Sequence, residues 1–221
     1  MSTIQKAHKG PAMEGVIASW YARITRGDRG YATLASAIAA RTRPGGRVLE
    51  VAPGPGYLAI ELARRGLATS GIDISRSFVR IANDNAHAAG VAIEFRRGNA
   101  SALPYPEGSF DFVVCRAAFK NFTDPLGALD EMHRVLVPGG QASIIDLRRE
   151  CSVAEINAEV ESMHLSRLNA LWTRATFRWF LLKNAFTAEG MRQLAAQSRF
   201  GGGELRNDGV AFDLRLVKPS T

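Results

Sequence analysis

The sequence predicts an α/β fold in which a doubly wound, mostly parallel sheet is covered by helices on both faces. Short apolar runs typical of buried strands alternate along the chain with segments of helical pattern, which is the signature of such a sheet. A glycine-rich turn over residues 52–56 directly follows the first of these runs and precedes a helical segment. The last run, residues 210–217, alternates apolar and polar side chains, so we expect an edge or antiparallel strand at the end of the chain.

Turn and capping residues separate the expected elements. Pro44, Gly45 and Gly46 end the second of two N-terminal helices, because proline and glycine interrupt a helical pattern. Ser75 and Gly90 are placed to begin and end a later helix, as residues that cap helices do. The expected strands cover residues 47–51, 68–73, 92–96, 110–115 and 141–147, with one or two more within 204–217, and the expected helices cover 14–26, 31–41, 57–65, 75–89, 125–136 and 187–198.

Composition and charge limit the class of protein. Hydrophobic residues make up 46% and charged residues 22% of the chain, as in ordinary soluble domains, and charge interrupts every long apolar stretch, so we expect no transmembrane helix. The two cysteines, Cys115 and Cys151, give neither a disulfide framework nor a metal site, and a cytoplasmic location follows by default. The net charge of +7 comes from scattered arginines, which favours a solvated surface over a nucleic-acid groove.

The glycine-rich turn is typical of a cofactor cradle. Gly54 and Gly56 carry no Cβ, so a ligand can approach their backbone closely, and the helix that follows directs its N-terminal amides at whatever lies over the turn. The spacing of Gly54, Gly56 and Ala59 taken alone also fits a dinucleotide fingerprint. A nicotinamide-dependent oxidoreductase is therefore an alternative at this point.

Residues in register with the turn favour a different cofactor. Glu50, on the strand before it, suits a cationic ammonium group better than a pyrophosphate. Asp73, at the end of the second strand, could accept both hydroxyls of a ribose. Asn99 and Ala100 follow the third strand, where an amide could bind an adenine edge, although Asn99 could instead cap its own loop.

With residues 103–114 and 136–140 added to these, residues 41–147 resemble the class I S-adenosylmethionine-dependent methyltransferases. More narrowly, they are similar to the small-molecule branch that includes the ubiquinone/menaquinone C-methyltransferases. The resemblance implies a Rossmann-like, seven-stranded sheet whose last strand is antiparallel. It implies S-adenosyl-L-methionine as cofactor, S-adenosyl-L-homocysteine as product, and a small-molecule acceptor methylated by direct in-line displacement.

The resemblance also assigns residues to parts of the cofactor. The stretch from Glu50 to Gly56 holds the methionine part, Asp73 the ribose, and Ile74 with Asn99 the adenine, while Arg116 faces the reaction centre from below. The expected cofactor-binding residues are Glu50, Ala52, Pro53, Gly54, Gly56, Asp73, Ile74, Asn99, Ala100, Arg116, Ala117 and, from an N-terminal helix, Tyr21.

The chain departs from the family pattern at three places. Pro53 and Pro55 stand where the turn more commonly reads Gly-Cys-Gly-Thr-Gly, and each proline fixes φ and removes an amide donor. Asn99 replaces the usual carboxylate. Residues 119–122, Phe-Lys-Asn-Phe, match the Arg-Asn pair of the quinone methyltransferases imperfectly.

The acceptor site has weaker signals, and several questions stay open. Candidate acceptor contacts are Phe119, His164, Trp172 and Trp179. His164 is also a candidate general base, although a sulfonium leaves as a neutral thioether and a base is needed only if the acceptor must lose a proton. The aromatics after residue 153 could equally form an amphipathic helix packed on the body. A cofactor-binding protein that transfers no methyl group remains an alternative, and so does any oligomeric state, a homodimer included.

These assignments divide the single expected domain into three parts. Residues 1–41 hold a tail and helices that cover the cofactor site. Residues 42–150 form the S-adenosylmethionine-binding core, and residues 151–221 hold a helical substrate-lid segment and the closing strands. A chain of 221 residues is long enough for one such core.

Overall fold

A seven-stranded sheet organises the chain. The computed structural model describes residues 8–9, 13–28, 30–162 and 182–220. The strand order is β3-β2-β1-β4-β5-β7-β6, with parallel pairing from β3 to β5 and antiparallel pairing of β7 with both β5 and β6. The strands are β1 (Arg47–Val51), β2 (Ala68–Asp73), β3 (Glu94–Arg97), β4 (Phe110–Arg116), β5 (Leu136–Leu147), β6 (Glu204–Asp208) and β7 (Ala211–Val217).

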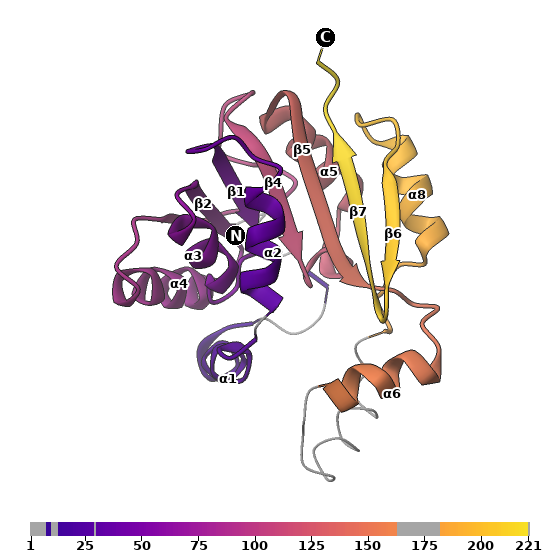
Figure 1. Cartoon of the computed structure of the whole chain (residues 1–221), viewed down its shortest axis with the longest axis horizontal. Helices are drawn as coiled ribbons and strands as arrows, with labels where there is room; N and C mark the ends of the chain where they lie inside the picture. The colour runs from indigo at the N-terminus through magenta and orange to yellow at the C-terminus, as the bar shows by residue number, and fades with distance from the viewer. Residues whose placement is uncertain (1–7, 10–12, 29, 163–181, 221) are drawn as a thin grey trace, which may run out of the picture.

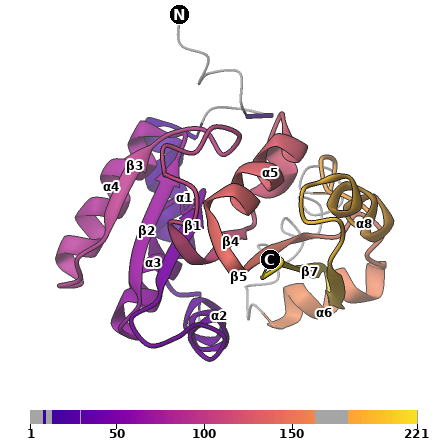
Figure 2. The ribbon, with the colours of Figure 1, turned by 90° about the horizontal axis from the view of Figure 1, so that it is seen from above.

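Helices cover both faces of this sheet (Figures 1 and 2). Clusters of buried side chains show that α2, α3 and α4 pack on one face, whereas α5 and α8 pack on the other. The helices are α1 (Gly15–Thr25), α2 (Gly30–Ala39), α3 (Tyr57–Arg64), α4 (Arg76–Ala88), α5 (Pro125–Val135), α6 (Val153–Ser162) and α8 (Ala188–Gln197), with a short 3₁₀ helix η2 (Phe119–Asn121). None of them, within the described ranges, is long and apolar enough to cross a membrane.

The predicted fold class is confirmed, and most element boundaries agree with the sequence within a few residues. The clearest difference is β5, which begins at Leu136 and not at Gln141. The expected turn at residues 138–140 lies inside the ladder, where Phe110 pairs with Leu136 but Phe112 pairs with Gln141. Gly139, with φ +77°, allows this bulge, so the strand continues through it. Of the expected helical substrate-lid segment after residue 151, the structure describes residues up to 162 and from 182 onward.

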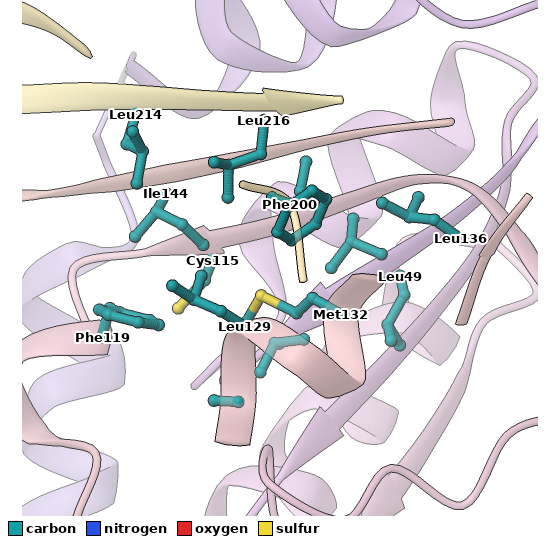
Figure 3. Close-up of a cluster of buried hydrophobic side chains, with 14 of the residues drawn as sticks. Leu49, Cys115, Phe119, Leu129, Met132, Leu136, Ile144, Phe200, Leu214 and Leu216 are labelled. Carbon is teal, nitrogen blue, oxygen red and sulfur yellow. The ribbon is translucent and has the colours of Figure 1, made fainter. Parts of the chain in front are cut away.

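The main core lies between the sheet and helices α5 and α8 (Figure 3). Leu49, Cys115, Leu129, Met132 and Ile144 are fully buried within it. Every residue of β1 after the first is buried, because a central parallel strand is covered on both faces. The core therefore fixes β1 and β4 side by side, and with them the segments that follow their carboxyl ends.

Two glycines allow the closest approach of helix to sheet. The ring of Phe95 lies over Gly56 and Gly71, so that a Cβ at Gly56 would stand 2.8 Å from Phe95 Cζ and 3.0 Å from Ala82 Cβ. Gly56 also has φ +80°, a region that side chains rarely adopt. Its role is therefore to let the start of α3 pack tightly on the sheet.

We expect Gly56→Ala to lower the free energy of unfolding by about 2–4 kcal/mol, because it adds a clash to the left-handed strain. Gly66 offers a matched control, since it has the same φ of +80° but nothing within 4 Å of its Cβ. Gly66→Ala should cost only the strain, about 1–2 kcal/mol. Urea unfolding of both variants measures the difference, and equal losses would show that the Phe95 contact is unimportant.

Candidate cofactor site

The candidate site lies at the carboxyl ends of β1 and β4. These strands are neighbours in the sheet although β2 and β3 separate them in the sequence, so the chain leaves them toward opposite sides. Ligands of open α/β sheets bind in the crevice at such a switch point. The glycine-rich turn follows β1 here, and Arg116 and Ala117 lie at the end of β4.

Internal hydrogen bonds use the amides of the glycine-rich turn. The Ala52 N–H donates to Ile72 O (2.8 Å) and the Gly56 N–H to Pro53 O (3.0 Å), while the Gly54 N–H donates to Asp73 Oδ2 (3.0 Å). Pro53 and Pro55 have no amide to offer. Because a pyrophosphate is bound largely by free backbone N–H groups, this turn is poorly suited to the dinucleotide that the glycine spacing alone would allow.

Two alanines at this edge have left-handed backbone conformations. Ala52 has φ +57° and Ala117 has φ +60°, and they follow directly the adjacent strand ends of β1 and β4. A non-glycine residue in this region is strained by about 1–2 kcal/mol. Such strain persists where the surrounding structure holds it, and it is frequent at functional sites.

Glu50 is a buried carboxyl group that makes no ion pair with the described residues, although the charge of Arg116 acts to lower its pKa. Its side chain is 3% exposed, and its Oε2 has no hydrogen-bond partner among the described residues. Burial raises the pKa of Glu50 to about 8, against a smaller opposing effect of a backbone hydrogen bond from Ala59. A buried acceptor without a donor is costly, so the position suits a positively charged ligand.

Asp73 lies at the end of β2 beside the same turn. Its Oδ2 accepts the Gly54 N–H and its Oδ1 accepts the Ser75 N–H (2.9 Å). Burial raises the pKa of Asp73 to about 6, although these amides oppose the shift. Each carboxylate oxygen can accept a further hydrogen bond, so Asp73 can also take the hydroxyl groups of a ribose.

Helix α1 lies over the turn because its first residues are tied to α4. The Glu14 carboxylate accepts the N–H groups of Arg76 and Ser77, each at 2.9 Å, and Ser75 Oγ donates to Met13 O (2.6 Å). Tyr21 of α1 packs edge-on against Phe78, with ring centroids 5.8 Å apart. A Cβ on Gly54 would lie 4.0 Å from both of these rings, so the two rings lie directly over Gly54.

Arg116 connects the end of β4 to the turn between α1 and α2. Its Nη2 donates to Asp28 Oδ2 (2.7 Å), and its guanidinium lies 4.4 Å from the ring centroid of Tyr31. Burial acts to lower the pKa of Arg116, but the hydrogen bond to Asp28 and the charges of Asp28, Tyr31 and Tyr21 together outweigh it, so the pKa is raised. Burial also raises the pKa of Tyr31 to about 12. Arg116 is thus a fixed cation at the mouth of the site.

Comparison with known proteins agrees with this geometry. Residues 49–144 match the model of the methyltransferase domain family. This part of the chain is therefore similar to a methyltransferase domain. The matched residues include Glu50, the turn, Asp73, Asn99 and Arg116.

Two curated relatives and one solved structure illustrate the similarity. A demethylmenaquinone methyltransferase of Deinococcus radiodurans is 41% identical over 54% of this chain and 50% of its own length. A ubiquinone/menaquinone biosynthesis C-methyltransferase of Xanthomonas oryzae is 36% identical over 54% of this chain and 47% of its own. The chain thus spans about half the length of these relatives. The structure of an S-adenosyl-L-methionine-dependent methyltransferase from Methanococcus maripaludis, itself described as putative, superposes with TM-score 0.77 at 20% identity over 97% of this chain and 98% of its own, which supports the fold.

The residues of this site fit S-adenosylmethionine. The cofactor carries an ammonium and a sulfonium group, and the site presents two buried acids, Glu50 and Asp73, of which one has an unpaired oxygen. Gly54 carries no Cβ, so a ligand can approach its backbone closely. Glu50 would hold the cationic methionine part and Asp73 the ribose.

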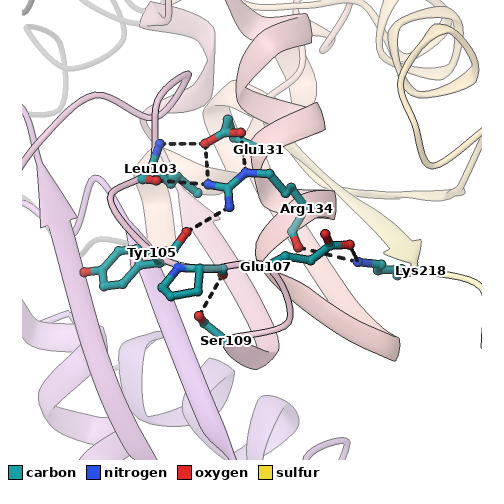
Figure 4. Close-up of polar contacts among 8 residues, drawn as sticks. Leu103, Tyr105, Glu107, Ser109, Glu131, Arg134 and Lys218 are labelled. Atoms are coloured by element: carbon teal, nitrogen blue, oxygen red, sulfur yellow. Dashed lines mark hydrogen bonds and ion pairs between the residues drawn. The ribbon is translucent and has the colours of Figure 1, made fainter.

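The residues expected at the adenine lie in a loop that is held from α5. Asn99 Oδ1 accepts the Ser101 N–H at 3.1 Å, so the loop-capping role is present in the structure, and its amide nitrogen remains for a ligand. Ile74 and Ala100 are half-buried nearby. Arg134 donates to Leu103 O (3.0 Å) and Tyr105 O (2.8 Å), and Glu131 accepts the Leu103 N–H (2.8 Å), as Figure 4 shows.

Of the residues expected to contact the methyl acceptor, only Phe119 lies within the described part of the chain. Phe119 is fully buried and packs against Phe122 and Phe186, with ring centroids 5.2 and 5.9 Å apart. Its observed contacts are those of a core residue. His164, Trp172 and Trp179 lie outside the described residues.

Sequence reasoning missed two pairs near the site. Asp28 meets Arg116 across 88 positions of sequence, and Lys120 meets Asp146 across 26. No local signal announces either pair, because the partners come together only when β4 and β5 pair and the N-terminal helices dock. The approximate Arg-Asn match at residues 119–122 was the nearest hint of Lys120.

The Glu50 carboxyl makes stability depend on pH. In the unfolded chain its pKa is near the ordinary 4.5, whereas in the folded chain it is about 8. The folded protein therefore holds the extra proton between these values, and stability falls as pH rises through this window. We expect Glu50→Gln to raise the melting temperature of the cofactor-free protein at about pH 8.5, and to change it little at about pH 5.

Calorimetric melting at both pH values measures this effect. Glu94→Gln serves as the control, since the Glu94 side chain is 58% exposed and its removal should shift neither value appreciably. A Glu50→Gln protein that melts below the parent at the higher pH would contradict the assignment of Glu50 as an uncompensated buried acid.

Proposed function

We propose that this protein transfers a methyl group from S-adenosylmethionine to a hydrophobic small-molecule acceptor of the quinone class. The observation that carries the proposal is the unpaired, buried carboxyl of Glu50 beside Asp73 at the switch point of a methyltransferase-like domain. It supports a cationic nucleoside cofactor and gives no support to a nicotinamide cofactor. The names of these relatives, which concern demethylmenaquinone and ubiquinone/menaquinone, suggest the acceptor class.

The exposed apolar side chains support an apolar acceptor. Among the described residues, the exposed large hydrophobic side chains lie mostly on α1, with one more on α6. These helices lie at the same end of the molecule, where the parallel strands finish (Figure 1). The residues are Val16, Ile17, Trp20 and Ile24 on α1 and Val153 on α6, and only Val217 lies elsewhere. An exposed apolar patch next to a site is a surface on which an apolar ligand can enter.

The proposed chemistry asks little of the protein beyond position. The bound cofactor supplies an electrophilic methyl group whose leaving group is a neutral thioether, so an acid is not required. Glu50 and Asp73 hold and orient the cofactor, and α1 with Tyr21 covers it. His164 remains our candidate for a base if the acceptor must lose a proton.

We also propose the cytoplasm as the location of the protein. Cys115 is buried and Cys151 partly buried, and both are free thiols. Free cysteines suit a reducing compartment.

A turnover assay tests the proposed function. We expect the purified chain to convert S-adenosylmethionine to S-adenosylhomocysteine when a demethylmenaquinone with a short prenyl tail is present, and mass spectrometry should show one added methyl group on the quinone. Glu50→Gln should lose most of this activity, because the ammonium group loses its counter-ion.

Controls separate the alternatives. Tight binding of NAD(P) without binding of S-adenosylmethionine would contradict the proposal in favour of an oxidoreductase. Binding of S-adenosylhomocysteine without turnover of quinone, catechol or amine acceptors would contradict it in favour of a cofactor-binding protein that transfers no methyl group.

A further inference from the structure

A buried ion pair lies beside the site and is used by none of the steps above. Lys120 of η2 and Asp146 of β5 have side chains that are 9% and 1% exposed, with Nζ and Oδ1 2.8 Å apart. They stand just beyond the end of β4 and near the end of β5. Both are therefore at the carboxyl edge of the sheet, on the side of Arg116 and Ala117.

The hydrogen bonds of this pair tie the turn after β4 to the end of β5. Lys120 Nζ donates to Ala117 O at 2.9 Å as well as to Asp146. The Asp146 carboxylate also accepts the Lys120 N–H (2.9 Å) and the Leu147 N–H (2.7 Å). The Ala117 N–H in turn donates to Ile145 O at 2.7 Å. Ala117 is thus held from both its amide and its carbonyl.

The residue so held is the strained one. Ala117 has φ +60°, a left-handed conformation that glycine adopts freely and alanine does not. A conformation of this kind persists only where neighbouring groups enforce it. The two hydrogen bonds of Ala117, one of them from Lys120, are the groups that enforce it here.

The stability of the folded protein does not by itself explain why Lys120 and Asp146 are buried as an ion pair. Two charges taken out of water lose their hydration, and apolar side chains of similar volume at such places are often as stable or more so. The pair is also within electrostatic reach of the site, because Asp146 and Lys120, together with Glu50 and Asp73, act on the buried thiol of Cys115 and help to determine its raised pKa, which burial dominates. Lys120 and Asp146 therefore belong to the same strand end as the cofactor carboxylates.

We propose that Lys120, oriented by Asp146, is a positioning residue that keeps Ala117 in its left-handed conformation and so fixes the segment 116–118 beneath the bound cofactor. This role rests on cofactor binding and is independent of the acceptor. This role explains why a lysine is buried here. The Lys120–Asp146 pair connects the strained turn after β4 to β5.

The test asks whether a glycine at position 117 can compensate for the loss of the Lys120 side chain. Lys120→Met removes the hydrogen bond to Ala117 O, and Ala117 then loses its enforced conformation. We expect the affinity for S-adenosylhomocysteine, measured by titration calorimetry, to fall about tenfold. Adding Ala117→Gly to this variant should restore the affinity to within about threefold of the parent, because glycine adopts the left-handed region without strain. A purely structural lysine would not be rescued in this way.

Lys218 provides a matched control. It is another buried lysine, whose Nζ donates to Leu136 O (2.9 Å) and lies 3.3 Å from Glu107 Oε1, and Figure 4 shows it close to Arg134. It follows the end of β7, at the opposite edge of the sheet. We expect Lys218→Met to lower the melting temperature while it leaves the affinity for S-adenosylhomocysteine unchanged.

Two results would overturn the proposal. One is unchanged affinity in Lys120→Met, and the other is a loss that Ala117→Gly does not restore. Should Lys120→Met fold poorly, the variant with both Lys120→Met and Asp146→Leu removes the unpaired charge and takes its place in the same comparison. A crystal structure of that double variant should show Ala117 outside the left-handed region, and a φ still near the parent value would equally overturn the proposal.

Discussion

The burial of two carboxyl groups at one strand edge is the constraint on which the site depends. Glu50 and Asp73 are 3% and 6% exposed, and burial raises the pKa of both carboxyl groups, with a smaller contribution of the Asp73 charge to the shift of Glu50. The core requires β1 to be covered on both faces, so Glu50 cannot turn to solvent. The ionised form of the Glu50 carboxyl becomes favourable only when a cation binds beside it. Cofactor binding and the loss of the Glu50 proton are therefore linked equilibria.

The backbone around these acids is stiff by construction. Pro53 and Pro55 fix two φ values of the turn, and the remaining amides are engaged by Ile72, Pro53 and Asp73. The turn therefore offers shape and closeness of approach more than hydrogen-bond donors. Ala52 and Ala117 have left-handed backbone conformations, so the backbone is also constrained at the ends of β1 and β4. A preformed edge of this kind costs little ordering when a ligand binds.

Much of this arrangement could be predicted from sequence, because it is carried by local patterns. The run from Arg47 to Gly56 indicates strand, turn and helix from hydrophobicity and glycine spacing, and Asp73 follows from the end of the next strand. Ser75 was expected as an N-cap, and its Oγ accepts the Phe78 N–H at 3.0 Å. Local patterns failed where long-range packing decides. Phe119 was expected to contact the acceptor, yet η2 directs it into the core beside Phe122, and the Asp28–Arg116 and Lys120–Asp146 pairs depend on strand pairing that spacing does not reveal.

The central claim is that Glu50 stays protonated near neutral pH until a cationic cofactor binds. Titration calorimetry of S-adenosylmethionine near pH 7, in two buffers of different ionisation enthalpy, measures the protons exchanged on binding. The account predicts release of close to one proton by the parent protein and almost none by Glu50→Gln under conditions in which that variant still binds. Binding by the parent protein without proton release would contradict it.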